Sequence, residues 1–293
     1  MNALLALAAA LSYGVSDFLG GLAGRRLAVA TTLLIAQVTA GLLLVVTLGL
    51  VPGRPLAADL AWGAVAGLLA ATGGALLYGG LARGPMSVVA PLSAVCVAGV
   101  PLAAGLALGE RPGAEGMAGA ALGLAGVVLV SRPPPSRDAA RRGRLGVTVA
   151  MAFGAGLSFG AFFVVLPHTR PQAGLVPLLV CYTVSALAFA AVRLRPWLAR
   201  ELREQLAAAG FAVAAGALEA LAHCCYLFAT RGGLLSIAAV LTALYPAATV
   251  LLARFVLAER FSRMQRIGLP VVAVALCLLG WASPADGWPS SVR

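Results

Sequence analysis

Charged residues are scarce in this chain of 293 residues, and lysine is missing altogether. Only 11% of the residues are charged, whereas 61% are hydrophobic and the mean hydropathy is +0.98. This composition excludes an ordinary soluble domain, in which about 25% of the residues are charged. We therefore expect a multi-pass protein of the cytoplasmic membrane, with the lipid bilayer around most of the chain.

Motifs of soluble chemistry are also missing. The chain has no phosphate-binding glycine loop with lysine, no nucleophile elbow and no HExxH motif. Its net charge of +11 comes from arginines that flank apolar stretches, which is typical of membrane spans rather than of nucleic-acid binding. We therefore expect no enzyme activity, no cofactor and no nucleic-acid partner.

Long apolar stretches dominate what is present, and a membrane-spanning helix needs about 20 such residues. In lipid a helix satisfies its own backbone groups, whereas an open strand does not. The sequence predicts an all-α integral membrane protein with ten transmembrane helices, over residues 3–22, 29–51, 61–82, 86–108, 114–130, 145–166, 174–194, 206–229, 234–257 and 266–283.

The second half of the chain repeats the first. SVVAPLSAVCVAGVPLAAGLALGER at 87–111 matches SIAAVLTALYPAATVLLARFVLAER at 236–260, with an offset of 260 − 111 = 149 residues. Leu-Ser-Tyr-Gly at 11–14 matches Leu-Ser-Phe-Gly at 157–160, with an offset of 146. Internal repeats in a polytopic membrane protein indicate a transporter whose site lies between the halves.

The polar segment SRPPPSRDAARRGR divides the ten stretches into two groups of five. Five is an odd number, so the second group would enter the membrane in the opposite direction, as two inverted five-helix repeats. We predict a first repeat over 1–130, a charged proline-rich linker over 131–144, a second repeat over 145–283 and a polar tail over 284–293. A polar stretch over 195–205 is expected to form a short interfacial helix.

Asp17 lies inside the first predicted span, on one helical face with Tyr13 and Gly14. A charge within a membrane is costly and indicates a functional group. Asp17 is a candidate proton carrier or counter-ion for an amine. The alternative is an aspartate near a helix end that reaches toward Arg25 or Arg26.

The eighth span carries Glu219 and His223 four residues apart, so that they share a face with Tyr226. Glu219 and His223 form a candidate proton relay or substrate clamp; the alternative is a buried pair with a structural role. With a local offset of 231 − 83 = 148, their first-half counterparts are Ala71 and Ala75. The halves are thus chemically unequal at these positions.

Cys224 and Cys225 follow His223 and suggest a metal site at first sight. Consecutive residues diverge by about 100° around a helix, so both cysteines point away from the face of Glu219 and His223. One helix also cannot supply a complete ligand shell. We expect no metal site.

The ninth span places Thr242 and Tyr245 beside Pro246, and its counterpart carries Ser93. A proline inside a span frees a carbonyl and can kink the helix. We predict that the substrate pathway is lined by polar residues of spans one, four, eight and nine, with Asp17, Glu219 and His223 as coupling groups. The candidates are Tyr13, Asp17, Ser93, Glu219, His223, Tyr226, Thr242 and Tyr245.

The segment LSYGVSDF at 11–18 resembles the first-helix pattern of EamA-type members of the drug/metabolite transporter superfamily. The regions of Pro91 and Pro246, followed by Glu-Arg at 110–111 and 259–260, are similar to that family as well. The resemblance implies ten helices, a central cavity open to one side at a time, and export or exchange of small metabolites.

Two features depart from the family pattern. Asp17 stands where the family usually has a neutral asparagine, and its second-half counterpart is Phe163. The pair of Glu219 and His223 matches no family signature. The resemblance also implies that both termini lie inside, whereas the arginines concentrate in the loops on the opposite side, which favours both termini outside.

The sequence therefore favours a secondary transporter that exports a small organic metabolite, amino-acid-like or similar, by alternating access. Its expected partners are that solute, the lipid bilayer and the proton as coupling ion. Efflux of lipophilic cationic drugs is an alternative, and a non-transporting membrane scaffold is one from a different class. A monomer suffices, since both halves lie in one chain; a homodimer through the glycine-rich fifth helix is the alternative.

Overall fold

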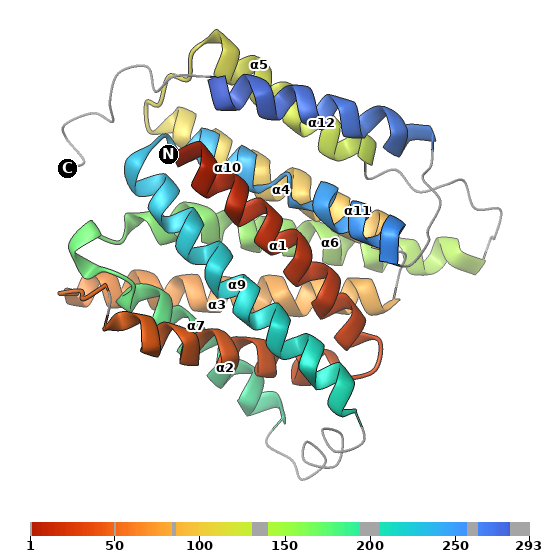
Figure 1. The fold of residues 1–293 in the computed structure, drawn as a ribbon. Helices are drawn as coiled ribbons and strands as arrows, with labels where there is room; N and C mark the ends of the chain where they lie inside the picture. The colour runs from red at the N-terminus through yellow and green to blue at the C-terminus, as the bar shows by residue number, and fades with distance from the viewer. Residues whose placement is uncertain are drawn as a thin grey trace.

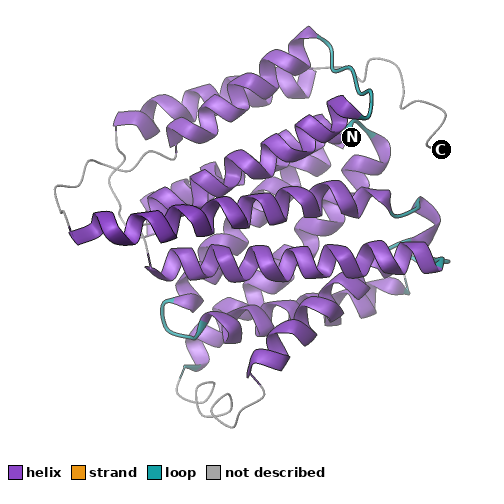
Figure 2. Cartoon of the chain, turned by 180° about the vertical axis from the view of Figure 1, so that it is seen from behind, coloured by secondary structure: helices purple, strands orange, loops and turns teal. Residues whose placement is uncertain are grey.

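The computed structural model describes residues 2–49, 51–83, 86–130, 140–193, 205–256 and 263–281. Within these ranges the regular secondary structure is entirely helical (Figures 1 and 2). The first half contains α1 (Asn2–Gly24), α2 (Val29–Leu48), α3 (Ala57–Arg83), α4 (Met86–Ala107) and α5 (Ala114–Val130). The second contains α6 (Ala140–Val165), α7 (Val176–Arg193), α9 (Leu206–Gly232), α10 (Leu235–Thr242), α11 (Tyr245–Val256) and α12 (Arg263–Trp281), with the 3₁₀ turns η1 (Leu166–His168) and η2 (Pro171–Ala173) between α6 and α7.

The predicted all-helical fold is confirmed. Five segments are long and apolar enough to cross a bilayer, and they belong to α1, α2, α3, α6 and α9. The outer surface carries large apolar side chains: Leu4, Val46 and Phe255 expose 71%, 75% and 81% of their area. Such a surface suits lipid rather than water. The molecule is a multi-pass membrane protein, and ten spans stay a prediction.

The ninth predicted span is broken into two helices. α10 ends at Thr242 and α11 begins at Tyr245, with a 3₁₀-type bond from the Leu244 amide to the Leu241 carbonyl at the break. Pro246 explains the interruption, because proline lacks an amide hydrogen and its ring clashes with the carbonyl four residues earlier. α4 contains Pro91 and Pro101 and is continuous over Met86–Ala107, so proline alone does not decide where a helix breaks.

Two boundaries differ from the prediction or cannot be compared with it. α6 begins at Ala140, inside the segment predicted as linker, since its arginines are good helix formers and need not lie in lipid. The interfacial helix predicted over 195–205 lies almost wholly outside the described residues, as do most of the linker and the polar tail.

The two halves exchange packing partners in the same pattern. α1 lies along α9, and its counterpart α6 lies along α3. α2 packs against α9, as α7 packs against α3. α5 and α12 lie side by side at one edge of the bundle (Figure 1). Each half therefore completes the packing of the other.

Glycines in the repeated motif make two of these close contacts. A methyl group on Gly14 would lie 2.7 Å from the Tyr245 carbonyl oxygen, and one on Gly160 would lie 2.9 Å from that of Cys96. Cys96 and Tyr245 are equivalent under the offset of 149. The same glycine in each half thus lets the backbones of opposite helices meet, as small residues do in membrane proteins.

A second glycine pair fixes the register of α3 and α9. A methyl group on Gly67 would lie 2.6 Å from the Cys181 carbonyl oxygen, and one on Gly216 would lie 2.2 Å from that of Ala36. The offset between these two glycines is 216 − 67 = 149. The sequence alone gives 148 for this part of the repeat, one residue less. The structural counterparts of Glu219 and His223 are therefore Ala70 and Gly74, not Ala71 and Ala75.

Glu110 joins the two halves at a buried position. Its carboxylate accepts hydrogen bonds from the Leu235 and Ser236 amides at 2.7 and 2.9 Å, at the start of α10. A carboxylate suits a helix N-terminus, where free amides and the helix dipole favour negative charge. In α5 a methyl group on Gly126 would lie 2.7 Å from the Val272 side chain, so this part of α5 packs within its own chain against α12.

Candidate functional site

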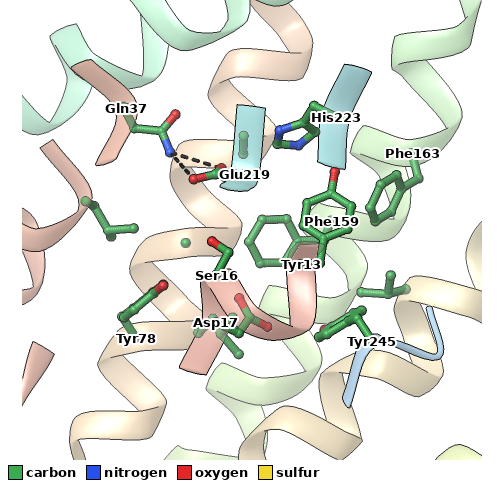
Figure 3. Close-up of a pocket in the computed structure, with 15 residues that line it drawn as sticks. Tyr13, Ser16, Asp17, Gln37, Tyr78, Phe159, Phe163, Glu219, His223 and Tyr245 are labelled. Carbon is green, nitrogen blue, oxygen red and sulfur yellow. Dashed lines mark hydrogen bonds between the residues drawn. The ribbon is translucent and has the colours of Figure 1, made fainter. Parts of the chain in front are cut away.

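A cavity of about 60 Å³ lies where helices of both halves meet. Its walls come from α1, α2, α3, α4, α6, α9 and α11 (Figure 3). Five of the eight predicted pathway residues line it: Tyr13, Asp17, Glu219, His223 and Tyr245. The structure thus brings together residues that are up to 232 positions apart in the chain (245 − 13).

The other three candidates, Ser93, Tyr226 and Thr242, do not line the cavity in this conformation and hold helices together instead. The Tyr226 hydroxyl donates to the Phe163 carbonyl at 2.6 Å. The Thr242 hydroxyl donates to the Ala6 carbonyl at 3.5 Å, which is a weak contact. Ser93 is fully buried, with its backbone against Gly156.

Sequence reasoning missed several lining residues, among them Gln37, Tyr78 and Phe159. Gln37 is the one glutamine inside a predicted span, so its polarity was an available signal. Phe159 is the repeat counterpart of Tyr13, as Phe163 is of Asp17, and both phenylalanines line the cavity. Tyr78 carried no signal, because it lies near a span end.

The two acids of the cavity lie on facing sides of the same space (Figure 3). Gln37 donates from Nε2 to both carboxylate oxygens of Glu219, at 3.2 and 3.3 Å. Among the described residues, no hydrogen bond or ion pair reaches the Asp17 carboxylate, and no arginine lines the cavity. Since buried charges are normally paired, this arrangement leaves two acidic groups without a fixed counter-ion.

The His223 ring contacts α7 and α1 and also interacts with the Glu219 backbone. Its Nδ1 is hydrogen-bonded to the Tyr182 hydroxyl, and its ring meets those of Tyr13 and Phe162 edge-on, at centroid distances of 5.2 and 4.8 Å. No hydrogen bond joins the side chains of His223 and Glu219 in this part of the chain. The side chain of Glu219 is thus bonded to α2 and that of His223 to α7, and the joint role of the two residues stays a prediction.

A second polar cluster joins helix ends and loops at the end of the bundle where α1 begins. The Asp59 carboxylate, 1% exposed, accepts from the Leu56 amide at 2.8 Å and from the Arg170 amide at 2.9 Å. The Arg170 guanidinium adds bonds to it at 2.8 and 3.1 Å. Arg231 at the end of α9 then donates to the Arg170 and Gly174 carbonyls. We call Asp59, Arg170 and Arg231 the closing cluster.

The same end includes the first residue that the structure describes, because Asn2 is hydrogen-bonded to the Gly232 carbonyl beside Arg231. The cavity lies deeper in the bundle, since Tyr13, Gln37 and Glu219 occupy the middle of their helices. Asp17 and Tyr78 place it nearer to the opposite end, where Arg25 and Arg26 follow α1. The closing cluster and the cavity therefore lie at different depths of the bundle.

The family follows from a direct comparison. A profile described as "EamA-like transporter family" matches residues 1–132 and 146–281. The chain belongs to this family, and it is a membrane transporter of the drug/metabolite type. This is a family of transporters and not a class of enzymes.

The solved structures support the fold. One described as "Crystal structure of protein" matches with a TM-score of 0.63 and 15% identity, covering 96% of this chain and 99% of that chain. At this identity the likeness concerns the fold alone. No curated protein matches the chain in sequence.

The hydroxyls of Tyr182 and Tyr13 give a matched test of the site. Tyr182→Phe removes the partner of a buried imidazole, so we expect a loss of about 1–3 kcal/mol in unfolding free energy. Tyr13→Phe removes a buried hydroxyl that has no partner, so its effect is expected to be neutral or slightly stabilising. Thermal unfolding of both purified variants in one detergent measures this. Equal destabilisation by the two changes would contradict the hydrogen-bond assignment.

Proposed function

We propose that the protein is a secondary transporter that exports a small organic metabolite, amino-acid-like or similar, across the cytoplasmic membrane by alternating access. The observation that carries the proposal is the cavity between the two halves, lined by two partly buried acids. Transporter sites built from internal repeats lie at the interface of the repeats. The cavity lies there, and both halves contribute to its walls.

The repeats are proposed to be inverted, with five spans in each. Figure 1 shows successive helices running back and forth along a common direction. After five passes the counterpart of α1 starts from the opposite end of the bundle. The exchanged packing of α1 on α9 and of α6 on α3 supports this arrangement. Because one chain supplies both halves, the proposal requires no second copy, although a homodimer is compatible with it.

Asp17 and Glu219 are the proposed coupling groups, and the proton is the proposed coupling ion. Two carboxyl groups that share a cavity disfavour each other's ionised form, so a proton or a cationic solute lowers the free energy of the pair. His223, Tyr13 and Tyr245 complete the proposed binding surface. Ser93, Tyr226 and Thr242 act in this account by holding the helices that frame the cavity.

The closing cluster is proposed to be the gate on the side of the termini. Asp59 starts α3, Arg170 precedes α7 and Arg231 ends α9, so opening that side has to separate these helix ends. Packed interfaces of this kind change between discrete arrangements and do not deform continuously. This conformation then represents the state closed toward the termini.

Efflux of lipophilic drugs fits the cavity less well. Sites for drug-sized ligands have volumes of about 300–1,000 Å³. The cavity here has about 60 Å³, which suits a solute of a few heavy atoms or one that enlarges the site on binding. A non-transporting scaffold would have no use for two acids inside a bilayer that lack a counter-ion.

Neutralising Glu219 tests the function. We expect Glu219→Gln to lower the appearance of the exported solute in the medium about tenfold at equal membrane abundance, since one charged contact contributes about 1.5–3 kcal/mol. The measurement is a metabolite comparison of medium and cytosol for cells with wild type, Glu219→Gln or no transporter.

The control is Glu115→Gln, the same change at an exposed position of α5 outside the cavity. Export that is equal for wild type and Glu219→Gln would remove Glu219 from the mechanism. Medium that is identical for wild type and cells without the protein would contradict export.

The gate has its own test. Asp59→Asn removes a carboxylate that accepts four hydrogen bonds, of which an amide oxygen replaces only part. We expect hydrogen exchange of residues 51–56 and 169–175 to accelerate about tenfold or more, because local opening becomes easier. Mass spectrometry of the purified protein measures this. The loop over 108–113 serves as the internal control, and unchanged exchange at the gate segments would contradict the assignment.

A further inference from the structure

The charge inventory of the cavity is one-sided. Asp17 and Glu219 contribute two carboxyl groups, whereas the described lining residues include no arginine. The one lining imidazole, that of His223, already has the Tyr182 hydroxyl on Nδ1. A solute with a positive charge would supply what the cavity lacks, since carboxylates in low dielectric are stabilised by a nearby cation.

The hydrogen-bonding groups of the cavity that have no partner also favour a cationic ligand, and this argument does not depend on charge. The Tyr13 hydroxyl is buried without a partner, and the Tyr13 side chain is only 9% exposed. The Gln37 side-chain oxygen is also buried without a partner, while its nitrogen is used by Glu219. The unused capacity of the cavity therefore includes acceptors at Asp17 and Gln37 and a Tyr13 hydroxyl that can accept or donate, and such a set matches a ligand with several N–H donors.

We infer that the cavity binds a small organic amine, in its ammonium form and without a carboxylate of its own. The inference rests on the proposed transport function. It narrows the substrate class from an amino-acid-like or similar metabolite to an amine that lacks a carboxylate. An ammonium group carries three donors and one positive charge on a compact centre, which fits both inventories at once.

Aromatic rings form another part of the cavity wall. Tyr13 lies edge-on to Phe163 at a centroid distance of 5.8 Å and tilted against Tyr245 at 6.2 Å. Phe159 lines the cavity beside them. Aromatic rings attract cations through their π faces, most strongly where water is excluded.

A carboxylate on the solute would meet unfavourable surroundings. It would share the cavity with Asp17 and Glu219, and the described part of the wall offers no guanidinium to receive it. α11 starts beside the cavity, at Tyr245. Pro246 has no amide hydrogen there, and the Ala247 amide is bonded to the Leu244 carbonyl at 3.0 Å.

Binding of the amine exchanges one cation for another. The ammonium ion forms hydrogen bonds to the carboxylate oxygen, the O–H bond of the protonated carboxyl group breaks, and its proton leaves to the solution on the open side. No electron is transferred and the total charge of the site is unchanged. Amine moving one way is thereby exchanged for protons moving the other way.

The test uses two matched pairs that differ only by a carboxylate. Ethanolamine is serine without its carboxyl group, and cadaverine is lysine without its own. Purified full-length protein in liposomes is assayed for uptake of each radiolabelled probe, with empty liposomes as background. Variants Glu219→Gln and Asp17→Asn are compared with Glu115→Gln, the matched change outside the cavity.

We expect the amine of at least one pair to enter at least ten times faster than its parent amino acid, with release of protons from the liposomes. Glu219→Gln and Asp17→Asn are expected to abolish that preference, and Glu115→Gln to keep it. Faster uptake of serine and lysine than of their amines would overturn the inference and leave the transport function standing.

Uptake of all four probes at the level of empty liposomes would overturn the inference as well. The transport function is judged separately by the metabolite comparison in cells, which does not depend on these probes. A preference for amines that survives both Glu219→Gln and Asp17→Asn would also contradict the inference, because the carboxyl groups would then not be what recognises the cation.

Discussion

The close approach of helices from opposite halves, made possible by glycine, is the constraint on which the rest of this structure depends. In lipid the hydrophobic effect does not bring helices together, so association relies on close van der Waals packing and on interhelical hydrogen bonds. Gly14 against α11 and Gly160 against α4 provide that packing twice, at equivalent positions of the repeat. Any larger residue there would separate the halves and widen the cavity between them.

The cavity results from this symmetry together with a local departure from it. α9 contributes Glu219 and His223, whereas its counterpart α3 contributes Ala70 and Gly74 at the equivalent positions. One half therefore supplies polar groups and the other supplies space. On α1 and α6 the equivalent positions carry Asp17 and Phe163, an acid in one half and an aromatic ring in the other. A solute bound between such halves meets two different walls, as an asymmetric molecule requires.

The sequence predicts much of the fold, because hydrophobic length and turn residues are local signals. It also identifies Asp17 and Glu219, since a charge inside an apolar stretch stands out. It does not reveal that Glu219 is bonded to Gln37 and His223 to Tyr182, because these partners lie 182 and 41 residues away. The closing cluster was missed for the same reason: Asp59 and Arg170 appear as ordinary span-end charges until folding joins them.

The most direct test of a central cavity at the repeat interface introduces the same larger side chain on either of two faces of α3. Ala70 lines the cavity and Ala75 is exposed on the outside of the helix. Leucine at either position is compared with wild type for export of the solute found in the medium, at equal membrane abundance. The account predicts that Ala70→Leu lowers export about tenfold or more, because its side chain occupies the binding space, and that Ala75→Leu has wild-type export. Normal export by Ala70→Leu would contradict the account.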